Sequence, residues 1–235
     1  MTGSGATPEQ VPPSALAVFG ARLALAERYA TILVTEGVIR GVIGPREPAR
    51  IWSRHLLNCA VVTDLFPETA RVVDVGSGAG LPGVAMAIRR PDVRVDLVEP
   101  LQRRVDFLAG VIDALGLHDQ IRIERGRADD PQIGAKFGSA DSVTARAVAP
   151  LDRLVRWCLP LLAEHGQLAL IKGAGAAEEI AQHRLAIHRA GAVGASVTTC
   201  GVGLIDPTTS VVTARREQWR AARQAKPRPA GKGER

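Results

Sequence analysis

The stretch RVVDVGSGAGLPG, residues 71–83, decides how this chain is organised. Its first five residues form a valine-rich run, which is typical of a short buried strand. Four glycines and Pro82 follow, and this composition is typical of a tight turn that opens into a helix. Glycines let the backbone approach a ligand closely, and a helix N-terminus offers free N–H groups. The stretch therefore predicts a strand, a ligand-binding loop and a helix.

Strand-like and helix-like segments alternate after this loop. Apolar runs predict strands at 71–75, 93–99, 121–125, 141–146, 166–172, 194–201 and 210–215. Helical stretches are expected at about 82–90, 101–116, 150–162 and 175–190. This alternation predicts an α/β protein with a mostly parallel seven-stranded sheet and helices on both faces. Only Gly201 to Thr209 separate the last two runs, so we expect the last strand to be antiparallel.

The segment before the loop has a different pattern. Residues 1–13 are rich in Gly, Pro, Ser and Thr, and we expect them to be disordered. Apolar residues then recur every three or four positions from Ser14, a plausible N-cap, and a second helix is expected over about 47–65. The predicted organisation is an N-terminal helical cap over 14–66, a Rossmann-like domain over 67–216 and a basic flexible tail over 217–235.

The composition excludes several classes of protein. Hydrophobic residues make up 46% of the chain, which is enough for a large core. No apolar run reaches the roughly 18 residues that a membrane span needs, and MTGSGATPEQVPPS (1–14) does not resemble a secretory signal. The scattered cysteines form no Cys-x-x-Cys pair, which argues against a disulfide framework and a zinc site. We expect a cytoplasmic protein with no membrane or metal partner and with three free thiols, Cys59, Cys158 and Cys200.

Basic residues gather at the carboxyl end. The chain has 30 Lys and Arg against 24 Asp and Glu, for a net charge of +6. Residues 215–235 contain eight basic and two acidic residues, so this segment accounts for the whole excess. It can be a solubilising tail or an arm that binds a polyanion, and the sequence leaves both interpretations open.

Two classes of ligand use a glycine loop of this kind. Gly78, Gly80 and Gly83 fit the G-x-G-x-x-G pattern of dinucleotide-binding proteins. An acid followed by G-x-G-x-G, here Asp74 with Gly76, Gly78 and Gly80, is typical of enzymes that bind S-adenosylmethionine. A carboxylate at the strand end repels a pyrophosphate and attracts the amino group of a cationic ligand, which favours S-adenosylmethionine. An acid at the end of the next strand, Glu99, can bind both ribose hydroxyls of either ligand.

Other stretches carry a family resemblance. They are RHLLNC (54–59), LVEPLQRRVDFL (97–108), GRADD (126–130), VTARAVAPL (143–151) and LIKG (170–173). With the glycine loop they make the chain similar, over about residues 15–215, to the ribosomal RNA small subunit methyltransferase G family. The resemblance implies a class I S-adenosylmethionine-dependent methyltransferase fold. It also implies methylation of N7 of a guanine in the 530 loop of 16S rRNA, as free RNA or in a 30S ribosomal particle.

The resemblance and the residue patterns together name the expected cofactor site. The family's cofactor positions match five residues of this chain: Gly76, Leu81, Ala128, Asp129 and Arg146. The patterns themselves add four: Asp74, Gly78, Gly80 and Glu99. Position 128 is a small alanine, so we expect its contact to be made by the backbone.

The implied chemistry needs no general base. N7 of guanine has a lone pair in the plane of its ring, so catalysis requires in-line placement of N7 against the methyl group. We therefore expect no acid–base residue, and Arg146 is the one candidate for contact with the reacting groups. Arg103 and Arg104 are interpreted as a solvated helix face. RNA contacts are expected at three residues: Arg54, His55 and Lys172.

Other functions remain as alternatives at this stage. A class I methyltransferase could act on a small molecule or a protein, which would leave the basic tail without a role. An NAD-binding oxidoreductase would need a hydride-transfer site, and no His or Tyr-x-x-x-Lys pair stands at a predicted strand end. A non-catalytic nucleic-acid-binding module would not explain Asp74 beside three glycines. No protein partner is predicted.

Overall fold

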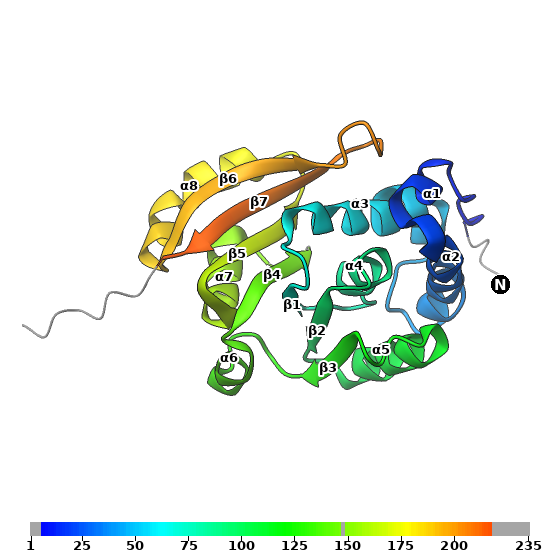
Figure 1. The fold of residues 1–235 in the computed structure, drawn as a ribbon, viewed down its shortest axis with the longest axis horizontal. Coiled ribbons are helices and arrows are strands. Elements are labelled where there is room, and N and C mark those ends of the chain that lie inside the picture. The colour runs from blue at the N-terminus through cyan, green and yellow to red at the C-terminus, as the bar shows by residue number, and fades with distance from the viewer. Residues whose placement is uncertain (1–5, 147–148, 218–235) are drawn as a thin grey trace, which may run out of the picture.

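A computed structural model describes residues 6–146 and 149–217 of the chain. The rest of the expected basic tail, residues 218–235, and the first five residues lie outside the described part. Figure 1 shows a central sheet with helices packed on both sides and a group of helices from the N-terminal part at one end. None of the described helices is long and apolar enough to cross a membrane.

The sheet has the predicted number of strands and the predicted directions. Its strands are β1 (Arg71–Val75), β2 (Arg94–Glu99), β3 (Ile121–Arg125), β4 (Ala140–Arg146), β5 (Leu162–Lys172), β6 (Ala192–Cys200) and β7 (Thr209–Arg216). Their order is β3-β2-β1-β4-β5-β7-β6. The pairs from β3 to β5 are parallel, and β7 runs antiparallel to both β5 and β6. The mostly parallel sheet with an antiparallel last strand is confirmed (Figure 1).

Helices cover both faces of this sheet because the strands alternate their side chains between two cores. Val72 belongs to a core that includes α4 (Gly83–Arg89) and α5 (Gln102–Leu115). Val73 and Val75 belong to the opposite core, with α6 (Pro131–Phe137), α7 (Leu151–Cys158) and α8 (Ala176–Arg189). Helix α6 was not predicted, because PQIGAKF is short and lacks a clear apolar period. Asp130 starts this helix by accepting a hydrogen bond from the Gln132 backbone N–H at 2.8 Å.

The N-terminal helical cap consists of two helical stretches. The first contains α1 (Ser14–Phe19), η1 (Gly20–Arg22), α2 (Leu23–Ile32) and the π-helical turn η2 (Leu33–Gly37). The second contains η3 (Glu47–Arg50), η4 (Ile51–Leu56), α3 (Leu57–Ala60) and η5 (Val61–Leu65), which matches the helix expected over 47–65. Ser14 is the first helical residue rather than the N-cap, because Pro13 occupies the cap position and no side chain caps this end.

Residues 6–13, part of the segment expected to be disordered, contact the second helical stretch of the cap. Glu9 holds the segment in place, because its carboxylate accepts the backbone N–H groups of Trp52 and Ser53 at 2.8 and 3.0 Å. Its own N–H donates to the Pro48 carbonyl at 2.8 Å. The composition rich in Gly, Pro, Ser and Thr predicted disorder, and it gave no signal for the tertiary contacts that one acidic side chain makes.

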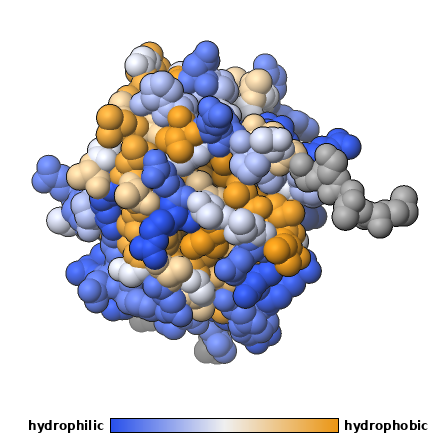
Figure 2. Space-filling model, turned by 90° about the vertical axis from the view of Figure 1, so that its right-hand side faces the viewer, coloured by the Kyte–Doolittle hydropathy of each residue, from blue (hydrophilic) through white to orange (hydrophobic). Residues whose placement is uncertain are grey.

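The cap packs on the glycine loop and on α4. Tyr29 is fully buried and donates its hydroxyl to the Ala79 carbonyl at 2.8 Å. Arg22 and Arg89 add bonds between the cap and α4, to the carbonyls of Ala87 and Ala60, each at 3.1 Å. The face of the molecule on this side, shown in Figure 2, mixes hydrophobic patches with hydrophilic side chains. The cap is thus joined to the glycine loop and to α4 by hydrogen bonds.

Candidate functional site

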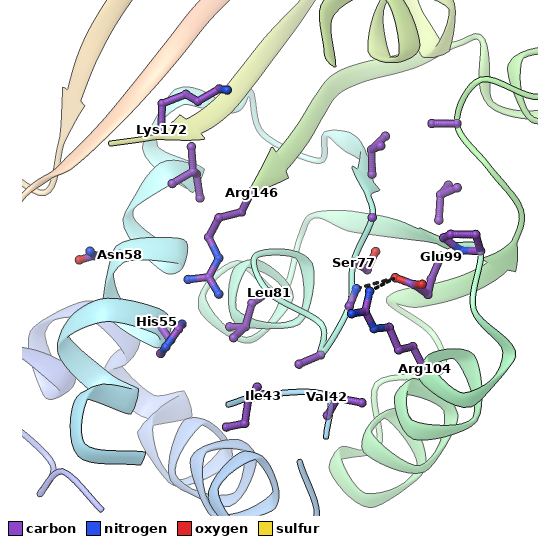
Figure 3. Close-up of a pocket in the computed structure, with 18 of the residues that line it drawn as sticks. Val42, Ile43, His55, Asn58, Ser77, Leu81, Glu99, Arg104, Arg146 and Lys172 are labelled. Atoms are coloured by element: carbon purple, nitrogen blue, oxygen red, sulfur yellow. Dashed lines mark hydrogen bonds and ion pairs between the residues drawn. The ribbon is translucent and has the colours of Figure 1, made fainter. Parts of the chain in front are cut away.

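A large cavity lies at the carboxyl ends of the parallel strands. Its volume is about 1050 Å³, and its wall includes the ends of β1, β2, β4 and β5 together with residues of the cap. Ligands of doubly wound sheets bind at this edge, where the strand order reverses around β1 and β4. Figure 3 shows side chains from these separate elements pointing into one space. The cavity is large enough for a nucleoside-sized ligand.

The glycine loop forms one wall. Gly76 donates its N–H to the Val98 carbonyl at 2.8 Å, which ties the loop to β2. Gly76, Gly78 and Leu81 line the cavity. Gly80 does not line it: with φ of +93° it packs against the cap, and a Cβ there would lie 2.8 Å from the Tyr29 hydroxyl. Gly76, Gly78 and Leu81 therefore face the cavity, whereas Gly80 supports the loop from the side of the cap.

Asp74 lies behind the loop and is absent from the cavity wall. Its side chain is fully buried, and Oδ2 accepts the Gly83 N–H at 3.0 Å at the start of α4. Its Oδ1 has no hydrogen-bond partner among the described residues. Burial raises the pKa of Asp74 to about 7. The expected direct contact with a ligand's amino group is not supported by this placement, because the strand turns the side chain into the core beneath α4.

Glu99, at the end of β2, lines the cavity as expected. It is fully buried, and its two oxygens accept the backbone N–H groups of Gly78 at 2.9 Å and Leu101 at 3.0 Å. Arg104 of α5 places Nη1 3.7 Å from Glu99 Oε2 (Figure 3). The expectation that Arg104 belongs to a solvated helix face is wrong, since it lines the cavity, whereas Arg103 is exposed as expected.

The loop after β3 brings two more expected residues to the cavity. Ala128 and Asp129 both line it. Asp129 is bound by the neighbouring Arg127 through two hydrogen bonds of 2.9 Å, and this pair lowers the pKa of Asp129. The carboxylate is therefore already paired on the surface, which leaves the backbone of this loop as the group that faces the cavity.

Arg146 at the end of β4 points into the cavity toward the cap (Figure 3). Its Nη1 donates to the Arg54 carbonyl at 3.4 Å. The neighbouring His55 is buried, and its Nε2 lies 2.5 Å from Glu47 Oε2. Burial and the nearby charge of Arg146 lower the pKa of His55 to about 4. The imidazole is therefore neutral at pH 7, donates Nε2–H to Glu47 and has no partner for Nδ1 among the described residues.

The three residues predicted to contact RNA differ in their availability. Arg54 is exposed at the rim of the cavity. His55 is packed against Glu47, as described above. Lys172 lines the cavity but is only 12% exposed, and its Nζ donates to Glu179 Oε1 at 2.9 Å and to the Ala149 carbonyl at 3.2 Å. Of the three, Arg54 has the most accessible charge.

Among residues 6–146 and 149–217, no three His, Cys, Asp or Glu side chains come together in a way that could hold a metal ion. The three cysteines are free and buried, as predicted.

Comparison with known proteins identifies the family. The family model of GidB, described as rRNA small subunit methyltransferase G, matches residues 22–206. A ribosomal RNA small subunit methyltransferase G from Salinispora arenicola is 51% identical over 95% of this chain and 92% of its own length. Its counterpart from Rhodococcus jostii is 51% identical over 88% of this chain and 90% of its own length. The chain belongs to the rRNA small subunit methyltransferase G family.

Membership of this family confirms the function class that the sequence predicted. The protein is an S-adenosylmethionine-dependent rRNA methyltransferase. Solved structures agree on the fold: a putative S-adenosylmethionine-dependent methyltransferase from Methanococcus maripaludis superposes with a TM-score of 0.56 at 12% identity, over 92% of this chain and all of that one. Aeropyrum pernix fibrillarin with bound S-adenosylmethionine gives a TM-score of 0.51 at 17% identity, over 68% of this chain and 74% of that one.

Sequence reasoning missed several residues that line the cavity in this member of the family. Arg104 could have been found, because it lies three, four and seven positions before the buried Phe107, Leu108 and Val111. The others gave no sequence signal, because the tertiary fold alone brings their segments to the sheet edge. They are Val42, Ile43, Glu47, Trp157 and the segment 208–210.

Proposed function

We propose that this enzyme methylates N7 of a guanine in the 530 loop of 16S rRNA, in free RNA or in a 30S particle, and that it acts in the cytoplasm. One observation carries the proposal: the glycine loop, Glu99 and Arg146 come from three different strands and line the same cavity. An acid, a glycine cradle and a cation at one sheet edge suit a nucleoside with an amino-acid side chain.

The wall of the cavity fits S-adenosylmethionine. A Cβ on Gly78 would have only the Gly76 carbonyl within 4 Å, so the loop leaves open space there for a ligand. Glu99 offers carboxylate oxygens for the ribose hydroxyls, and the loop of Ala128 and Asp129 lies at the same side of the cavity. When bound, the cofactor supplies an electrophilic methyl group. The proposed contacts are made by Gly76, Gly78, Leu81, Glu99, Ala128, Asp129 and Arg146.

The side chains of the cavity support a mechanism of placement without a general base. The carboxylates that line the described cavity are all engaged: Glu47 with His55 and Arg50, Glu99 with backbone N–H groups, and Asp129 with Arg127. The hydrogen bonds from Arg50 and His55 lower the pKa of Glu47 to about 2. At this pKa Glu47 accepts a proton poorly at pH 7, and guanine N7 has none to give. Catalysis then comes from holding N7 in line with the methyl group.

The guanine and its backbone would approach from the side of the cap. Arg54 at the rim can meet a phosphate, and Arg146 can donate to guanine O6 from within the cavity, which leaves the N7 lone pair free to attack. A target base inside a stem or loop has to leave its stack to enter such a cavity. The proposal requires neither a metal ion nor a protein partner.

The product provides the test. Deletion of the gene should remove one N7-methylguanine from the 530 loop, which is measured as loss of borohydride–aniline cleavage at that nucleotide. Complementation with the wild-type chain should restore cleavage, and the Glu99→Gln variant should restore it less. Persistent cleavage in the deletion strain would refute the 530-loop assignment. Methylation assays of the purified enzyme with free 16S rRNA and with 30S particles would show which of the two is the substrate.

A further inference from the structure

Arg104 stands at an unusual position for a helix-surface arginine. It lies in the first turn of α5, and its guanidinium faces Glu99 at 3.7 Å on the cavity wall. Its Nε is buried and has no hydrogen-bond partner among the described residues. Arg103, one residue earlier, is exposed. A surface arginine that only solvates a helix keeps its donors in water. Arg104 instead has a buried donor without a partner and lies beside a carboxylate of the cavity, which indicates a specific role.

Glu99 needs a cation at this position. Its side chain has no exposed surface, and an isolated buried carboxylate is strongly disfavoured. Two other cations of the cavity are committed elsewhere, Arg127 to Asp129 and Lys172 to Glu179. Within the described part of the chain, Arg104 is the basic side chain that forms an ion pair with Glu99. Its attraction stabilises the negative charge, and the backbone bonds from Gly78 and Leu101 set the orientation.

We propose that Arg104 is a positioning residue for the ribose of the cofactor and that it acts through Glu99. The guanidinium holds the carboxylate in the orientation in which its two oxygens accept both ribose hydroxyls. Arg104 does not contact the methyl group or the guanine. This inference rests on the proposed cofactor site. It replaces the interpretation of Arg104 as part of a solvated helix face with a role in cofactor binding.

A double-mutant cycle tests this inference. Binding of S-adenosylmethionine and S-adenosylhomocysteine to the full-length chain is measured by calorimetry for the wild type, Arg104→Met, Glu99→Gln and the double variant. Arg104→Met should weaken both ligands about equally, by roughly ten-fold, as expected for one interaction of a charged hydrogen-bond network. In the Glu99→Gln background the same change should cost less than about two-fold, because Arg104 then has no carboxylate to act on. Arg103→Met is the matched control and should leave both affinities unchanged.

A ribose-specific measurement separates positioning from a structural role. Wild-type enzyme should bind S-adenosylhomocysteine more tightly than its 2′-deoxy analogue, and Arg104→Met should lose most of this preference. Arg104→Lys should retain part of it, because it keeps the charge, and it provides a folded variant if the methionine variant unfolds. A loss of affinity that is unchanged in the Glu99→Gln background, or an intact ribose preference in Arg104→Met, would overturn the inference. Failure of the wild type to bind S-adenosylmethionine would instead refute the cofactor site itself.

Discussion

Two glycines of one loop serve different purposes at the scale of single residues. Gly78 has φ of +59° and faces the cavity, whereas Gly80 has φ of +93° and faces the cap. A Cβ on Gly80 would lie 2.6 Å from Val84 Cγ2 and 2.8 Å from the Tyr29 hydroxyl, whereas one on Gly78 would have only the Gly76 carbonyl oxygen nearby, at 3.8 Å. The sequence motif treats these positions alike, and their neighbours in space distinguish them.

The first prediction concerns this pair of glycines. Gly80→Ala should lower the free energy of unfolding by about 2–3 kcal/mol, because it adds a clash to backbone strain. Gly78→Ala should lower it by about 1 kcal/mol through strain alone, but it should weaken cofactor binding because its methyl group occupies the ligand's space. Thermal unfolding and calorimetry measure the two effects. Equal loss of stability in both variants would contradict the packing role of Gly80.

Asp74 provides the second prediction, on pH. Its pKa is raised from 3.8 to about 7 by burial, so between these values the folded chain binds a proton that the unfolded chain has released. Stability associated with Asp74 is therefore complete at low pH and is lost as the pH rises from about 4 to 7. The side chain of the Asp74→Asn variant stays uncharged, so this variant does not lose stability in that pH range. The difference in unfolding free energy between Asp74→Asn and wild type should thus increase in favour of the variant from pH 5 to pH 8.

Denaturant unfolding at the two pH values measures this difference. His55 has an opposite effect, because its lowered pKa of about 4 removes stability as the pH falls below about 6.5. It is present in both proteins and cancels when they are compared. Parallel stability profiles for wild type and Asp74→Asn would show that Asp74 is ionised in the folded chain.

At the scale of elements, the N-terminal helices shape the glycine loop from behind. Helix α2 contributes Tyr29, whose hydroxyl bonds to Ala79, and this contact joins residues 50 positions apart. The alternation of apolar residues predicted the strands and most helices within a few residues, because each pattern is local. It missed α6, and it started β5 at 166 rather than 162, because a register shift between the pairs Ala140–Leu162 and Ser142–Gln167 places Gly166 inside the strand.

Tyr29→Phe is the third prediction. It leaves the buried Ala79 carbonyl without this donor, which should cost about 1–3 kcal/mol of stability. Because Ala79 is part of the glycine loop, affinity for S-adenosylmethionine should fall several-fold as well. Thr31→Ala on the same helix is the control, since the Thr31 hydroxyl is exposed and bonds only within its own helix, to the Glu27 carbonyl. Calorimetry that finds unchanged affinity in Tyr29→Phe would show that the cap does not support the loop.

The whole molecule has an uneven distribution of charge. The excess of basic residues was predicted to lie in an arm from Arg215, but Arg215 and Arg216 belong to β7 and donate to the carbonyls of His165 and Leu162. Six basic residues follow the described part of the chain: Arg220, Arg223, Lys226, Arg228, Lys232 and Arg235. The polyanion-binding and solubilising interpretations therefore apply to these six.

The fourth prediction concerns a chain that lacks these six basic residues. If they meet phosphates, truncation after Glu217 should weaken RNA binding and reduce the slope of log K against log salt by about 0.7–0.9 for each lost contact. Cofactor affinity should not change, because the cavity lies among residues 42–210. A chain of full length with the six residues replaced by glutamine is the control for length. Unchanged slopes in both proteins, together with more aggregation, would identify a solubilising tail.

The sequence by itself determined the order of strands and helices, the glycine loop at the end of β1, and the family. These features depend on local periodicity and on a contiguous motif, so residues that are close together in the sequence are enough to predict them. Only the tertiary structure decided which side chains share the cavity. It turned Asp74 into the core, paired Lys172 with Glu179, and placed Arg104 beside Glu99. The physical reason is that a side chain's role depends on its direction and on partners distant in the chain, which become neighbours only when the sheet and the cap have packed.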